Sequence, residues 1–260
     1  MATAFAPALR MFESRAIAAR RTLRSALVSN ALNPLLFLLA VGYGVGAVVA
    51  PDEAAALPGG SYLAFLAPGL IVAVAMQLSA SESLWPVMVG LEWQKTYHAT
   101  AATPLRPRDI VLGHLLWVMA RAAVAGVLIG IVVATAGAAP PAGVAAVVPV
   151  AVLVATAFAG PITAFTAFVR QGEALTAAFR FAVIPLFLFS GTFFPIERLP
   201  EAAQPVAIVS PLFHGAELAR FAALGAPTAW PPLAHVLLLL ALTVGGAALA
   251  VRHVARVVQR

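Results

Sequence analysis

Three ionisable side chains stand within or beside long apolar stretches. Glu82 and Arg121 lie inside two of these stretches, and Arg180 lies near the start of a third. Because an unpaired charge is costly in lipid, such groups often mark a substrate path. A long basic side chain can instead reach back to a membrane interface. We therefore take Glu82 and Arg121 as candidates for the substrate path, and we favour the interfacial explanation for Arg180.

Catalytic and metal-binding patterns are missing from the sequence. The five histidines share no H-x-x-x-H spacing, and the chain has no cysteine. A P-loop needs a lysine within G-x-x-x-x-G-K-[ST], but Lys95, the one lysine, follows Trp93 and Gln94. Residues 42–47 match the loose G-x-G-x-x-[GA] pattern, but they lie in an apolar stretch with no strand before them. We expect no catalytic residue, metal or cofactor in this chain, so any driving ATP and Mg must bind a partner subunit.

The composition indicates that the solvent of this protein is lipid. The chain has 260 residues, of which 62% are hydrophobic and 10% charged, whereas soluble domains are about 25% charged. The net charge of +6 could suggest nucleic-acid binding. The basic residues flank apolar stretches, however, so they are expected to set topology and to contact lipid headgroups. We expect membrane lipids as partners and no nucleic acid.

The apolar stretches predict an all-α integral membrane protein. About 20 apolar residues cross a bilayer as a helix, and six stretches meet this length: 31–50, 62–84, 110–136, 144–169, 174–194 and 233–251. The first is too long and begins too late for the apolar part of a signal peptide. The pairs Gly42 with Gly46 and Gly126 with Gly130 predict close helix packing or dimerisation. The domain prediction is an interfacial helix over 1–30 and a six-helix transmembrane domain over 31–260.

The distribution of basic residues predicts the orientation. With the N-terminus in the cytoplasm, only Arg198 and Arg220 fall on the outer side. Twelve basic residues fall on the inner side: Arg10, Arg15, Arg20, Arg21, Arg24, Lys95, Arg106, Arg108, Arg170, Arg252, Arg256 and Arg260. Since cytoplasmic loops are enriched in Lys and Arg, both termini should be cytoplasmic in a multi-pass protein of the bacterial inner membrane.

The N-terminal segment has the pattern of an amphipathic helix. Apolar residues recur at steps of three and four, with arginines on a flank of the stripe: Phe5, Leu9, Phe12, Ala16, Ala19, Leu23 and Leu27. This pattern is typical of a helix that lies in the membrane interface. A soluble helix packed against a partner is the alternative, and we favour the interface because the first span follows directly.

Two segments between the spans carry the remaining features. Residues 85–109 form the main cytoplasmic loop, in which Asp109 is predicted to cap the next span. Residues 195–232 form an apolar outer loop broken by prolines, which predicts short helices that enter the bilayer and turn back. Because irregular backbone in a membrane needs protein or water around it, this segment is a candidate outer gate, with a surface loop as the alternative.

Three stretches carry a recognisable combination of residues. The first stretch runs from Tyr97 to Gly113, with Trp117 after it. The second is FLFSGTFFP at 187–195 followed by Leu199-Pro200, and the third is PLFH at 211–214 with Arg220 downstream. Together they resemble the ABC-2 type permease family, in particular its branches that export nodulation lipo-oligosaccharides and daunorubicin-type drugs, and the resemblance extends over nearly the whole chain.

The resemblance implies partners and roles for particular residues. It implies a dimer with a second permease copy or a paralogous permease, and two cytoplasmic ABC ATPase subunits that bind ATP and Mg. Residues 92–103 would be the coupling helix and 170–173 a second contact, so the predicted coupling residues are Glu92, Trp93, Gln94, Lys95, Tyr97 and Arg170. Substrate-path candidates are Glu82, Arg121, Phe189, Phe193 and Phe194, and outer-gate candidates are Pro195, Leu199, Pro211 and His214.

Physical reasoning supports the coupling surface independently, because aromatic residues are enriched at protein interfaces. Trp93 and Tyr97 could alternatively be aromatic residues of the membrane–water interface.

The predicted function is the permease subunit of an ATP-driven exporter of an amphipathic lipid, lipo-oligosaccharide or lipophilic drug, and not an enzyme. The alternative is a stand-alone ion-coupled carrier or channel, although carriers often have internal repeats and buried acids, and this chain has no clear repeat.

Overall fold

The computed structural model describes residues 2–20 and 36–259, and all the regular structure in these ranges is helical. The helices of the first half are α1 (Ala2–Ala19), η1 (Leu38–Tyr43), α3 (Pro51–Ala56), α4 (Tyr62–Met88), η2 (Val89–Trp93), α5 (Thr96–Ala101) and α6 (Pro107–Thr135). Those of the second half are α7 (Pro141–Val169), α8 (Gly172–Ala178), η3 (Phe179–Val183), α9 (Ile184–Phe189), η4 (Ile196–Arg198), α10 (Gln204–Val209), α11 (Pro211–Leu224) and α12 (Pro232–Val258).

Five helices among the described residues are long and apolar enough to cross a membrane. They are Tyr62–Trp93, Pro107–Thr135, Pro141–Val169, Gly172–Phe189 and Pro232–Val258. The predicted span 31–50 begins outside the described residues, and its described part holds η1 and a turn that ends near Val49. The multi-pass helical architecture is therefore confirmed, while a sixth span remains a prediction.

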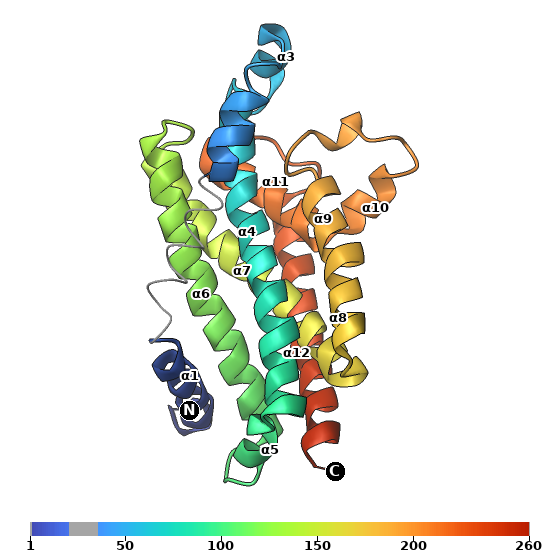
Figure 1. The fold of residues 1–260 in the computed structure, drawn as a ribbon. Coiled ribbons are helices and arrows are strands. Elements are labelled where there is room, and N and C mark those ends of the chain that lie inside the picture. Colours follow the sequence, from blue (N-terminus) through green and yellow to red (C-terminus); the bar gives the residue numbers. More distant parts are fainter. Residues whose placement is uncertain (1, 21–35, 260) are drawn as a thin grey trace.

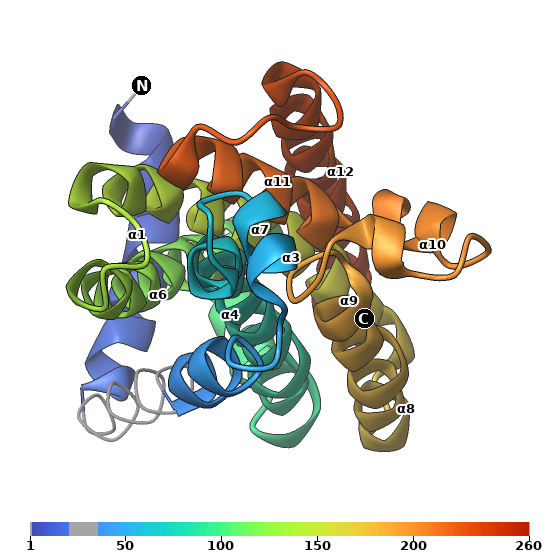
Figure 2. The ribbon, with the colours of Figure 1, turned by 90° about the horizontal axis from the view of Figure 1, so that it is seen from above.

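The long helices form a bundle with α7 near its centre (Figure 2). Helix α7 packs against α4, α6, α11 and α12. The helices α1 and α5 and the C-terminus lie at one end of the bundle, and α3, α10 and α11 lie at the other (Figure 1). We call the first the α5 end and the second the α11 end.

Helix starts follow from local sequence chemistry. Proline occupies the first turn of α6, α7, α11 and α12, where its missing N–H costs no hydrogen bond. Ser61 caps α4 by accepting a hydrogen bond from the Ala64 N–H at 3.2 Å. Ser210 does the same for α11 through the Leu212 N–H. At the other end of α11, Gly225 stops the helix with a φ of 66°.

Glycines set the closest helix contacts. A Cβ built on Gly246 of α12 would lie 2.2 Å from Pro161 Cδ of α7, and one on Gly160 would lie 2.7 Å from the Ala247 nitrogen. The predicted Gly126 and Gly130 pair also packs within the chain, since a Cβ on Gly130 would meet Val144 of α7 at 2.5 Å. This pair therefore serves packing inside one subunit, as small residues do between membrane helices.

Helix α1 runs across the bundle axis beside α6 rather than along it (Figures 1 and 2). Its buried residues are Ala8 and Met11, which lie against Gly113 of α6. Leu9, predicted to belong to the apolar stripe, is 49% exposed, whereas Phe12, Ala16 and Ala19 of the same stripe are partly buried. The placement of this stripe in the membrane interface stays a prediction. The predicted positions Leu23 and Leu27 lie outside the described residues.

Three predicted helix boundaries are wrong. The second span does not end at Leu84, because helical structure continues through Trp85 to Trp93. The fifth span ends at Phe189 and not at Phe194, since Gly191 turns the chain with a φ of 71°. Asp109 is not the N-cap of α6 but its third residue, where its carboxylate accepts the Arg106 backbone N–H at 2.9 Å.

Candidate functional site

The α5 end carries most of the predicted coupling residues at the sharp turn between η2 and α5. We call this turn, residues 92–97, the elbow. The helix through α4 and η2 ends at Trp93, whose side chain is 68% exposed. Gln94 and Lys95 follow, both exposed, and Lys95 adopts a left-handed φ of 51° that turns the chain into α5. Tyr97 on α5 is buried, with its ring over Gly90 of η2, where a Cβ would lie 2.8 Å from the ring. The glycine thus lets α5 fold back against the end of the long helix.

Two polar contacts tie this elbow to distant parts of the chain. Glu92 pairs with Arg170 at 3.1 Å, and Arg170 follows the last residue of α7. Arg15 of α1 donates a hydrogen bond to the Tyr97 hydroxyl. Burial raises the pKa of Tyr97, and the nearby Arg15 opposes that rise. The two predicted contact loops, around Glu92 and Arg170, are therefore joined directly, and α1 is joined to the same elbow.

The predicted substrate-path charges are paired with each other. Arg121 of α6 forms an ion pair with Glu82 of α4. The Trp117 indole donates a second hydrogen bond to Glu82 at 3.0 Å, and the Arg121 guanidinium lies 5.8 Å from the Trp117 ring centre. Phe12 of α1 contacts the same indole at a ring separation of 6.2 Å. Arg121 is therefore neutralised inside the bundle between α4 and α6.

The three predicted phenylalanines of the path lie near the turn after α9. Phe193 is buried and packs against Phe37 and Phe187 with ring separations of 5.4 and 4.9 Å. Its backbone carbonyl accepts a hydrogen bond from the Tyr62 hydroxyl at 3.0 Å. Phe189 is 49% exposed and contacts Phe194, which is partly buried. These rings form an aromatic cluster between α9, the Phe37 segment and the start of α4.

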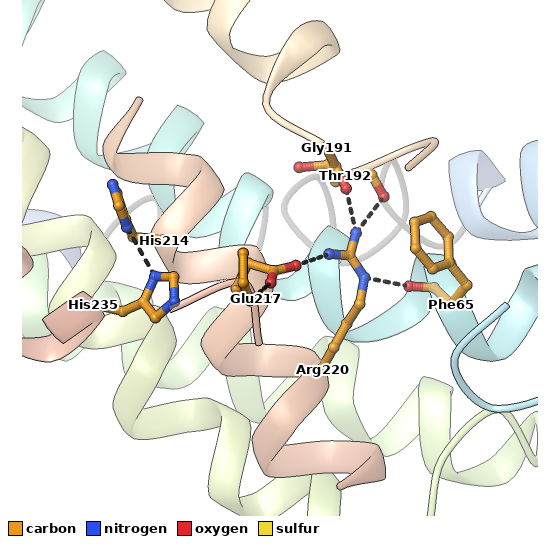
Figure 3. Close-up of polar contacts among 8 residues, drawn as sticks. Phe65, Gly191, Thr192, His214, Glu217, Arg220 and His235 are labelled. Carbon is orange, nitrogen blue, oxygen red and sulfur yellow. Dashed lines mark hydrogen bonds and ion pairs between the residues drawn. The ribbon is translucent and has the colours of Figure 1, made fainter. Parts of the chain in front are cut away.

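A buried arginine at the α11 end was missed as a site residue (Figure 3). Arg220 is 4% exposed, and its guanidinium stacks on Phe65 at 4.1 Å from the ring centre. It donates hydrogen bonds to the Gly191 and Phe65 carbonyls and pairs with Glu217 at 3.4 Å. The charge count predicted Arg220 only as a basic residue of the outer side, and the structure adds that its side chain is buried in the fold. The signal was its position, an arginine ten residues into an apolar segment.

Two histidines that are far apart in sequence meet beside this arginine (Figure 3). The Nδ1 atoms of His214 on α11 and His235 on α12 lie 2.8 Å apart, so one ring donates a proton to the other. Trp230 stacks on His235 with a ring separation of 5.9 Å. Burial and the neighbouring His235 lower the pKa of His214 to about 4. The described residues contain no group of three or more His, Asp or Glu that could hold a metal.

The other outer-gate candidates lie in the same region. Pro195 precedes η4 and Pro211 begins α11, while Leu199 is buried after η4. Pro195 also lines a cavity of about 440 Å³ together with Glu217, Arg220 and Phe213. The structure therefore brings Pro195 close to Arg220.

The five long apolar helices define a multi-pass membrane protein. Comparison with known proteins then gives its family. The ABC-2 type transporter family matches residues 9–224. Nodulation protein J of Rhizobium meliloti (strain 1021) is 31% identical over 211 residues, which cover 81% of this chain and 79% of that protein. Nodulation protein J of Rhizobium leguminosarum bv. trifolii is 32% identical over 211 residues, with the same coverages.

The chain therefore belongs to the ABC-2 type transporter family, as the resemblance predicted. It is a transmembrane component of an ABC exporter, and the family implies partnership with ABC ATPase subunits. Its place in the family makes it a transport component rather than an enzyme.

Proposed function

We propose that this chain is the permease subunit of an exporter in which a separate ATPase binds the elbow at Trp93 and α5. The observation that carries the proposal is an exposed tryptophan at the tip of one long helix. The helix Tyr62–Trp93 has 32 residues, so it is about 48 Å long at 1.5 Å per residue. A bilayer core is about 30 Å thick, so this helix can project beyond it.

The elbow is built to transmit force into several helices. A displacement of Trp93 acts directly on α4, through Glu92 and Arg170 on α7, and through Tyr97 and Arg15 on α1. Because helices are stiff along their axes, the same movement reaches the far end of α4. There Tyr62 contacts the aromatic cluster through the Phe193 carbonyl, and Phe65 contacts Arg220 of α11. We propose that Gln94 and Lys95 complete the surface that the ATPase contacts, with ATP and Mg bound by that partner.

The proposed orientation places the α5 end in the cytoplasm of a bacterial inner membrane. This end carries most of the basic residues, including Lys95, Arg170 and Arg256, as cytoplasmic loops do. Both termini then lie in the cytoplasm, with α1 in the membrane interface. The segment from η4 to α11 forms the re-entrant outer gate, in which Arg220 and His214 hold α11 in place.

The proposed assembly contains a second permease copy or a paralogous permease and two ATPase subunits. The fourth of the five apolar helices, Gly172–Phe189, buries little of its surface within the chain. Phe181 and Phe189 are exposed on it, at 80% and 49%. This surface suits contact with lipid, with a second permease or with an amphipathic substrate. The proposed substrate is a lipid, a lipo-oligosaccharide or a lipophilic drug, in keeping with the nodulation branch that the chain resembles.

A stand-alone ion-coupled carrier is the alternative. Such carriers use ionisable groups inside the membrane to bind the coupling ion. Here Glu82 is neutralised by Arg121 and also accepts the Trp117 hydrogen bond. This pairing favours a structural role for the acid and therefore favours the ATP-driven exporter.

The test is a comparison of Trp93 variants reconstituted with the ATPase partner. We expect Trp93→Ala to lower transport-coupled ATP hydrolysis at least several-fold, since interface tryptophans are often energetic centres of binding. Trp93→Phe should retain much of the coupling, because it keeps an apolar ring. Val48→Ala, at an 84% exposed position in another part of the chain, is the control. Unchanged hydrolysis in Trp93→Ala, with normal folding, would place the ATPase contact elsewhere.

A further inference from the structure

A basic cavity lies beside the elbow. It shares Glu92, Lys95 and Arg170 with the predicted coupling residues, whereas His98, His253 and Arg256 line the cavity alone. Its volume is about 460 Å³, within the usual range of about 300–1,000 Å³ for small-ligand sites. It is formed where the elbow, the end of α7 and the last two turns of α12 meet, and its ionisable lining residues are Glu92, Lys95, His98, Arg170, His253 and Arg256.

The cavity has an excess of positive charge. Three permanent cations line it and one carboxylate, Glu92, is already paired with Arg170. Lys95 and Arg256 form no ion pair with any residue that the structure describes. The buried Nδ1 atom of His98 likewise has no hydrogen-bond partner within residues 2–20 and 36–259. The cavity therefore offers unpaired donors to an anion.

The depth of the cavity matches the lipid headgroup layer. Helix α12 has 27 residues, so it is about 40 Å long, compared with a bilayer core of about 30 Å. His253 and Arg256 lie in its last six residues. Their side chains are therefore expected at the edge of the core, where lipid phosphates lie.

An apolar surface continues from the cavity toward the bilayer core. Phe168 lines the cavity, is 69% exposed and contacts the His253 ring at 5.5 Å. Phe165 and Leu249 lie about one helical turn deeper on α7 and α12 and are 37% and 50% exposed. Cationic groups above an exposed apolar surface are complementary to a phosphate with acyl chains below it.

We propose that this cavity binds the headgroup phosphate of an anionic phospholipid. Arg256 contacts the phosphate oxygens, the His98 and His253 rings provide further polar contacts, and the acyl chains lie along Phe168 and Leu249. Basic pockets between membrane helices at this depth are a known form of anionic lipid recognition. The proposal rests on the membrane location of the chain and not on the identity of its substrate or ATPase.

The experiment measures lipid binding to the purified, delipidated chain by native mass spectrometry. Phosphatidylglycerol and phosphatidylcholine with the same acyl chains are titrated separately. We expect the native chain to bind phosphatidylglycerol more tightly than phosphatidylcholine. The Arg256→Gln variant should bind phosphatidylglycerol about fivefold more weakly than the native chain, since one cation near the surface contributes about 1 kcal/mol. Arg252→Gln is the matched control, because Arg252 is an exposed arginine on the same helix that does not line the cavity.

Several outcomes would overturn the proposal. Equal losses in Arg256→Gln and Arg252→Gln, with unchanged thermal unfolding in both, would show only a general effect of surface charge. Equal retention of the two lipids would remove the need for an anionic headgroup. Inorganic phosphate that binds with the same dependence on Arg256, and displaces the lipid, would make the ligand a soluble anion. A defect of Arg256→Gln in ATPase binding alone would make the cavity a protein contact.

Discussion

Removing one partner of the ion pair between Glu82 and Arg121 should strongly destabilise the bundle. Arg121 lies fourteen residues after Pro107 on α6, so it is about 21 Å along that helix. The helix has 29 residues and is therefore about 43 Å long, compared with a bilayer core of about 30 Å. If the helix is centred, Arg121 lies about 14 Å inside the core, near its middle, by the same rise per residue.

Removal of one partner leaves a charge at that depth. The side chains of Arg121 and Glu82 are only 25% and 14% exposed, so solvent screening is limited. Breaking a buried pair by removal of one partner costs about 3–5 kcal/mol, whereas replacing both partners is often near neutral. We expect Glu82→Gln to lower the free energy of unfolding by about 3 kcal/mol, and Glu82→Gln with Arg121→Met to recover most of that loss.

The assay is unfolding of the purified protein in mixed micelles with increasing denaturing detergent, followed by helical circular dichroism. The exposed pair Glu53 and Arg198, at 3.1 Å with side chains 54% and 65% exposed, provides the matched control. Arg198→Gln should cost less than about 1 kcal/mol. The reasoning would be refuted if Glu82→Gln cost no more than Arg198→Gln, or if the double variant lost the sum of both single losses.

Three further predictions follow from contacts described above. Gly246→Ala should destabilise the α7–α12 contact by about 1–3 kcal/mol through overpacking. Gly245→Ala should be neutral, because its Cβ would meet nothing within 4 Å. Equal melting temperatures of the two variants would contradict this. The pKa of His214 is about 4 in the fold and about 6.5 when unfolded. As the pH is lowered, His214 is therefore protonated in the unfolded chain before it is protonated in the folded one. Stability should then fall from pH 6.5 toward 4, with a smaller fall in His214→Gln, and a flat melting profile in the native chain would count against the buried pair. Arg220→Lys keeps the charge but loses the fork that reaches the Gly191 and Phe65 carbonyls, so the loop after α9 should become more accessible to protease, and unchanged cleavage would refute that role.

Composition and apolar length were sufficient to predict the helical membrane fold, because every spanning helix must be long and apolar. They could not predict how the second span ends. Pro86 and Gly90 are usual helix breakers, yet Pro86 lies within α4, and Gly90 is needed where the Tyr97 ring lies against η2. The end of this helix is therefore decided by a tertiary contact that local sequence does not contain.

The residue types of the candidate site were visible in the sequence, but their partners were not. Arg15 meets Tyr97 across 82 positions, and Arg170 meets Glu92 across 78. Arg220 entered the sequence analysis only through the count of basic residues and the family resemblance, because nothing in the local sequence shows that backbone carbonyls of the loop after α9 hold it inside. Helix packing decides all three contacts. Trp93 stays a predicted contact residue, and its exposed position at a helix end needs no partner within the chain.

Transport by proteoliposomes that contain the chain with and without its ATPase partner tests the central claim most directly. The measured quantity is ATP-dependent movement of a fluorescent amphipathic probe across the bilayer. The account predicts movement only when chain, ATPase, ATP and Mg are all present, and its loss in Trp93→Ala. Equal transport by the chain alone, without ATP, would contradict the account and favour the stand-alone carrier.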